Sequence, residues 1–169
     1  MRNLILACCT VALITLTGGH ALAGPATFVI VNINDPGVGF NDPTPAAPIG
    51  GNTGTTLGEQ RLIAFHHAAS IWSARLDSTV PIRIRARFTP LAAGVLGSAG
   101  PIVVFSDFPN APLTGTWYHG ALANKLAGED LDPTNDDINA NFSTNFNFYL
   151  GIDNQSDGRP DLVAVLLHE

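Results

Sequence analysis

The alternation of hydrophobic and polar residues predicts strands at both ends of the first half of the chain. Residues 28–34 are β-branched and apolar on both faces, which is typical of a central strand. Residues 80–88 alternate strictly, with apolar side chains on one face and Arg83, Arg85 and Arg87 on the other, which predicts a half-buried strand. A solvated surface is the simpler interpretation of the three arginines, and an anionic ligand site is the alternative.

A long amphipathic helix is predicted between these strands. Thr56 and Glu59 have the spacing of a capping box, so the helix begins there and extends to about Leu76. Its expected buried face recurs at helical spacing and consists of Leu62, Phe65, Ala69, Trp72 and Leu76. The preceding residues 35–55 lack periodicity, so this long loop is expected to be functional or mobile.

The second half of the chain continues the alternation of strands and helices. We predict a short strand at 101–105, a helix at 116–126 capped by Thr116, and an acidic loop at 129–137. Residues 138–152 form a β segment with one apolar and one polar face, which is long enough to require a bend near Ser143. A buried helix then begins at Pro160. This order predicts an α/β or α+β fold in which helices cover one sheet.

The N-terminal residues have the pattern of a secretory signal peptide. A basic start is followed by an apolar run over 4–16 and by Ala21-Leu22-Ala23, a small-residue cleavage pattern. We therefore expect residues 1–23 to be removed and residues 24–169 to form one secreted or periplasmic domain. Both cysteines, Cys8 and Cys9, lie in the removed segment, so the mature domain has no disulfide and no thiolate metal ligand.

The charge of the chain excludes some classes of partner. Eight Lys and Arg residues, including Arg2 of the signal peptide, stand against 14 Asp and Glu residues, and the net charge is −6. An acidic domain of this kind is not expected to bind nucleic acid, nor a membrane once the signal peptide has been cleaved.

The most informative residues are the last two, His168 and Glu169. The apolar run 162–167 predicts a buried helix, and no Gly or Asn stop signal follows it. His-Glu is the first half of His-Glu-x-x-His, in which two histidines four residues apart share one helix face and hold zinc. We therefore expect the chain to be interrupted inside this motif.

The order of elements, together with His168-Glu169, resembles the N-terminal half of a zincin, the fold of His-Glu-x-x-His metallopeptidases. The stretches 39–46, 56–62 and 121–128 are similar to exported bacterial proteins of this kind. The resemblance implies a mixed twisted sheet, a long backing helix and the start of an active-site helix. It covers the whole of 24–169, although only two of the five motif positions are present.

This resemblance implies a zinc-dependent endopeptidase. His168 matches the first zinc ligand, and Glu169 matches the general base that takes a proton from the zinc-bound water attacking a peptide bond. The second histidine and the third ligand lie beyond Glu169, so the third can be His, Asp or Glu, and the chain as it stands is expected to be inactive. By position, Asn139, Asn141 and Ser143 match the edge strand that pairs with an extended peptide or protein substrate.

Two alternatives stay open. Calcium is a weaker cofactor candidate at five acidic residues of the 129–137 loop, for which a solvated loop is the simpler interpretation: Glu129, Asp130, Asp132, Asp136 and Asp137. A non-catalytic exported binding or surface module with a similar sheet is the alternative to the enzyme.

Overall fold

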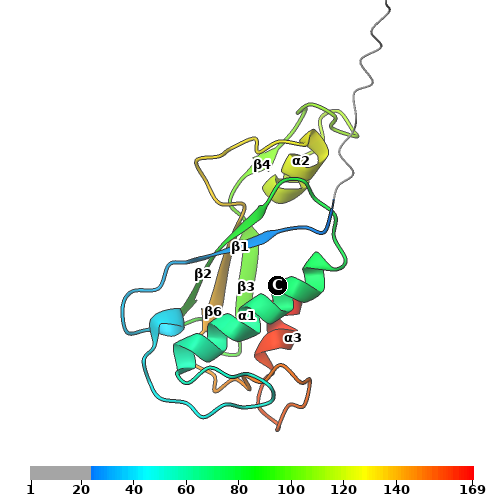
Figure 1. Ribbon diagram of the computed structural model, residues 1–169. Coiled ribbons are helices and arrows are strands. Elements are labelled where there is room, and N and C mark those ends of the chain that lie inside the picture. Colours follow the sequence, from blue (N-terminus) through cyan, green and yellow to red (C-terminus); the bar gives the residue numbers. More distant parts are fainter. Residues whose placement is uncertain (1–23) are drawn as a thin grey trace, which may run out of the picture.

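The computed structural model describes residues 24–169, so the predicted signal peptide lies outside the described residues. Within 24–169 the fold is α+β, with one mixed sheet, a two-stranded sheet and three α-helices (Figure 1), as the sequence pattern predicts. In chain order the elements are β1 Phe28–Asn32, the 3₁₀ helix η1 Gly39–Asn41, α1 Leu57–Ser73, β2 Ile82–Thr89, β3 Gly97–Pro101, β4 Val104–Phe105, β5 Tyr118–His119, α2 Gly120–Ala127, β6 Ile138–Ser143 and α3 Leu162–His168.

The main sheet has the strand order β1-β2-β6-β3. The strands β1, β2 and β6 are parallel, and β3 runs antiparallel to β6 at one edge. The prediction that 28–34 is a central strand is therefore wrong, because β1 pairs only with β2 among the described strands. Apolar residues on both faces do not identify a central strand, since the side chains of an edge strand can also be half-buried on both faces, as they are in β1.

The long helix α1 begins where the capping box predicts. The Glu59 amide donates to Thr56 Oγ1 at 3.2 Å, and the Thr56 amide donates to Glu59 Oε2 at 3.2 Å. The predicted buried face is only partly correct. Phe65 is buried, but Trp72 is 41% exposed, and the small residues Ala64 and Ala68 are buried although they were not expected on this face.

The shorter elements differ from their predicted bounds. The helix expected at 116–126 begins at Gly120, because Tyr118 and His119 pair with β4. It ends at Ala127, and Gly128 caps it in the left-handed conformation. The strand expected at 101–105 is divided between β3 and β4. β3 has the sequence Gly-Ser-Ala-Gly-Pro, which lacks the β-branched residues that normally reveal a strand.

The β segment that begins at Ile138 ends where the bend was expected. β6 stops at Ser143, and a turn follows before the chain returns toward α3. The helix expected to begin at Pro160 begins at Leu162, and Asp161 caps it. The Val163 amide donates to Asp161 Oδ1 at 2.8 Å, and the Ala164 amide donates to it at 3.3 Å.

The core lies between the sheet and the helices α1 and α3, which cover the same face (Figure 1). Aromatic rings from separate segments of the chain fill its centre, and they meet mainly edge to face. These rings belong to Phe40, Phe65, Phe88, Phe142 and Phe148. The helix α3 adds Leu162, Val163 and Leu166 to the same core and packs against α1. This packing positions the polar residues at the end of α3.

Candidate functional site

The last turn of α3 places the two predicted site residues at the protein surface. Leu162, Val163 and Leu166 are buried against the core, with exposures of 0%, 2% and 9%. His168 and Glu169 follow them and are exposed. The apolar half of α3 therefore anchors the helix, and its end presents an imidazole and a carboxylate to solvent from a rigid support.

Both residues line a groove of about 460 Å³ between α3 and the segment that leads into β3. The opposite wall consists of Gly94, Val95, Leu96 and Gly97. A side chain at Gly97 would lie 3.1 Å from Cγ and Oε1 of Glu169, so the glycine lets the carboxylate approach the strand closely. The groove thus joins the end of α3 to the antiparallel edge strand of the sheet.

This edge strand is a part of the site that sequence analysis missed. β3 ends the strand order, and its outer edge pairs with no other strand among residues 24–169. An unpaired edge offers backbone donors and acceptors to an added strand. The glycine content of β3 gives little strand signal, and only its pairing with β6 reveals its position.

The prediction that Asn139, Asn141 and Ser143 lie on an edge strand is wrong. β6 lies between β2 and β3 and is paired on both sides, so its backbone is not free to bind a peptide. The Asn139 and Asn141 side chains instead accept hydrogen bonds from arginines of β2, and Ser143 is fully buried. The sequence reveals the polar face of this strand, but strand order depends on contacts between distant segments.

The described residues do not by themselves fit a zinc ion. Within 24–169, no three His, Cys, Asp or Glu side chains gather closely enough to hold a metal. His168 is therefore a single candidate ligand. The histidines of α1 lie elsewhere: His66 is exposed and His67 is half-buried.

The acidic loop is largely folded on itself. Asp132 accepts hydrogen bonds from Thr134 Oγ1 at 2.6 Å and from Asn135 Nδ2 at 2.8 Å, and these bonds lower its pKa. Asp137 is buried and accepts from the Arg83 amide and from Asn124 Nδ2, both at 2.8 Å. Burial raises the pKa of Asp137, against the lowering effect of the Arg83 amide. Asp137 thus ties the loop to the start of β2.

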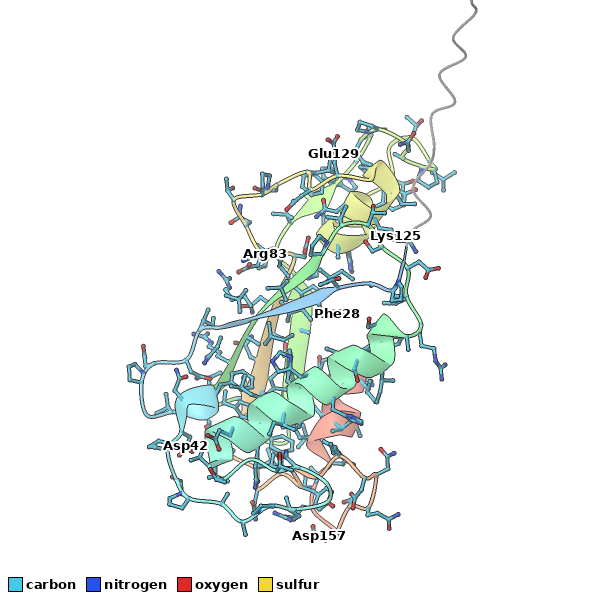
Figure 2. The ribbon with its side chains drawn as sticks, viewed as in Figure 1. Phe28, Asp42, Arg83, Lys125, Glu129 and Asp157 are labelled. Atoms are coloured by element: carbon cyan, nitrogen blue, oxygen red, sulfur yellow. The ribbon has the colours of Figure 1, made fainter. Side chains whose placement is uncertain are left out.

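A second, apolar pocket of about 360 Å³ lies on the helix-covered face of the sheet. Phe28 of β1, Trp72 of α1, and Leu122 and Lys125 of α2 line it. Phe28 and Lys125 are labelled in Figure 2. Glu169 borders this pocket as well as the groove beside β3. The end of α3 therefore lies where the two depressions meet.

Comparisons of the chain with protein-family models, with curated proteins and with solved structures give no match. Among residues 24–169, no helix is long and apolar enough to span a membrane. An assignment of function must therefore be argued from the residues of this chain.

Proposed function

We propose that residues 24–169 form the N-terminal part of an exported zinc-dependent endopeptidase. His168 would be the first zinc ligand, and Glu169 would be the general base. The observation that carries the proposal is the placement of His168 and Glu169 at the end of a core-anchored helix, in a groove bordered by β3. The outer edge of this antiparallel strand is unpaired among residues 24–169. Two further zinc ligands would have to come from residues outside 24–169.

The roles follow from the chemistry of the two side chains. A neutral imidazole is a common zinc ligand, and zinc acidifies a bound water molecule and polarises a carbonyl group. Glu169 would accept the proton of the attacking water. The carboxylate lies beside Gly97, so a peptide bond presented along β3 would be near it.

An extended peptide substrate would pair with the outer edge of β3. Such pairing holds a peptide through backbone hydrogen bonds, with little dependence on side-chain identity. In this proposal β3 replaces β6 as the substrate strand. Pro101 would end the pairing, because proline has no backbone N–H to donate.

The reading frame beyond Glu169 provides the first test. A histidine three positions after Glu169 is expected, since it would share the α3 face with His168. In the resulting full-length protein, His168→Ala should remove stoichiometric zinc. Glu169→Gln should retain zinc and lower the rate of peptide hydrolysis by about 10²- to 10⁴-fold.

His66→Ala is the matched control, because His66 is exposed on α1 and away from the groove. It should leave zinc content and hydrolysis unchanged. A different residue at the third position after Glu169, or a full-length protein that binds no zinc, would contradict the proposal. Either result would favour the non-catalytic binding module.

A further inference from the structure

The outer face of the main sheet carries three arginines of β2. Arg83, Arg85 and Arg87 alternate along β2 and are exposed, while Ile84 and Ala86 face the core. The helices α1 and α3 pack on the other face of the sheet, with the core residues. The arginines therefore lie on a surface that no helix among residues 24–169 covers.

Only the first of these arginines is neutralised. Arg83 Nε lies 2.9 Å from Asp136 Oδ1, near the end of β2 closest to α2 (Figure 2). Arg85 and Arg87 form no ion pair with any described residue, although the chain contains 14 acidic residues. Two adjacent positive charges thus stay uncompensated on an acidic protein.

The sheet register holds these two guanidinium groups in place. Arg85 is opposite Asn139 and Arg87 is opposite Asn141 across the β2–β6 ladder. Arg85 Nε donates to Asn139 Oδ1 at 3.4 Å, and Arg87 Nε donates to Asn141 Oδ1 at 2.9 Å. Because Nε is occupied, the two terminal nitrogens of each group can be directed to another partner. This arrangement suits a planar carboxylate.

The surface of β3 beside the Arg–Asn pairs carries only small residues. In the next strand, Gly100 is opposite Asn139 and Ser98 is opposite Asn141. A side chain placed on Gly100 would meet no atom within 4 Å. Two rows of Arg, Asn and a small residue therefore lie side by side and leave room for a ligand.

We propose that this surface, formed by Arg85, Arg87, Asn139 and Asn141, binds an extended peptide segment of a partner protein that carries carboxylates at alternate positions. Residues two apart on a strand are roughly 6.6–6.8 Å apart, so the two arginines match side chains at i and i+2 of an extended peptide. Each guanidinium group would hold one carboxylate through two hydrogen bonds.

A long polyanion fits this surface less well. The basic stripe is only two residues long, because Asp136 neutralises Arg83. A continuous row of phosphates or sulfates would meet the carboxylate of Asp136. The net charge of −6 also weakens long-range attraction, so binding depends on close contacts with two groups.

The test uses the purified protein and an end-blocked Thr-Asp-Thr-Asp-Thr peptide in titration calorimetry at low salt. The reference peptide, Thr-Asp-Asp-Thr-Thr, has the same charge but directs its carboxylates to opposite faces. We expect the alternating peptide to bind more tightly, and Arg85→Gln or Arg87→Gln to weaken it about ten- to a hundredfold. Asn141→Ala should also weaken it while leaving the charge unchanged.

Arg75→Gln is the matched control, since Arg75 is exposed and has no acidic partner among residues 24–169. It should leave binding unchanged. Equal affinity for the two peptides, an equal loss with Arg75→Gln, or binding of dextran sulfate without binding of the peptide would overturn the proposal. Circular dichroism establishes that each variant is folded.

Discussion

At the scale of single residues, Tyr149 shows how one hydrogen bond sets a titration. Its hydroxyl donates to Asp153 Oδ1 at 2.7 Å, and this bond, with a smaller effect of burial, raises the pKa of Tyr149 to about 12. The same bond lowers the pKa of Asp153. One hydrogen bond therefore shifts the pKa values of both Tyr149 and Asp153.

We predict that Tyr149 ionises near pH 12 in the folded protein. A raised pKa favours the protonated form in the folded state, so its contribution to stability is complete below pH 10 and is lost as the pH rises through 12. Absorbance at the tyrosinate band in a Tyr118→Phe background measures this ionisation. Asp153→Ala should move it to lower pH, and an unchanged titration would contradict the assigned bond.

Some residue roles follow from local sequence and others do not. Thr56 and Asp161 cap helices through neighbours two or three positions away, so their roles can be recognised from the sequence. Asn52 is fully buried, and its amide donates to the carbonyls of Gln60 and Leu150. The bond to Leu150 spans 98 residues, and no local pattern indicates it. This bond holds the loop at residues 35–55, for which the sequence predicted only a lack of regular structure.

At the scale of elements, the first turn of α1 packs closely against η1 and the residue after it. The Gly58 amide donates to Asp42 O at 3.0 Å. A Cβ atom at Gly58 would lie 2.5 Å from Phe40 O and 2.9 Å from Asp42 N. The glycine thus serves packing at a position where helix propensity would favour alanine.

Gly58→Ala should therefore destabilise the protein by about 1–3 kcal/mol, because the backbone of η1 would have to shift. Urea unfolding followed by circular dichroism measures the free energy of unfolding. His66→Ala, on the exposed face of the same helix, is the control and should change it little. A more stable Gly58→Ala variant would show that propensity outweighs the clash.

Element types were predicted better than element neighbours. The capping box, the alternation of β2 and the two faces of β6 are local patterns with periods of a few residues. Strand order depends on which distant segments pair. In the observed order β3, and not β6, is the edge strand. The proposed peptide-binding edge therefore lies at 97–101 instead of 138–143.

At the scale of the whole molecule, the core depends on Phe142. Its side chain is 1% exposed, and its ring centroid lies 5.6 Å from those of Phe65 and Phe88. These three rings come from β6, α1 and β2, so Phe142 joins the sheet to its covering helix.

We predict that Phe142→Ala costs about 3–5 kcal/mol of unfolding free energy, through lost burial and the cavity that is left. This is a large part of the roughly 5–15 kcal/mol that is usual for a domain. Thermal and urea unfolding measure it. Leu113→Ala is the control, since Leu113 is 63% exposed. A loss below about 1 kcal/mol would mean that the core is not organised around this ring.

The sequence alone indicates the α+β class, the capped start of α1, the inward and outward faces of β2 and β6, and the position of His168 and Glu169 at the end of an apolar helix. These features depend on residues a few positions apart. Only the tertiary structure decided that β1 and β3 are edges, that Glu169 lies beside Gly97, and that Asn139 and Asn141 hold the arginines of β2. Those contacts join segments that are far apart in the sequence, and hydrophobic periodicity carries no information about which distant surfaces will meet.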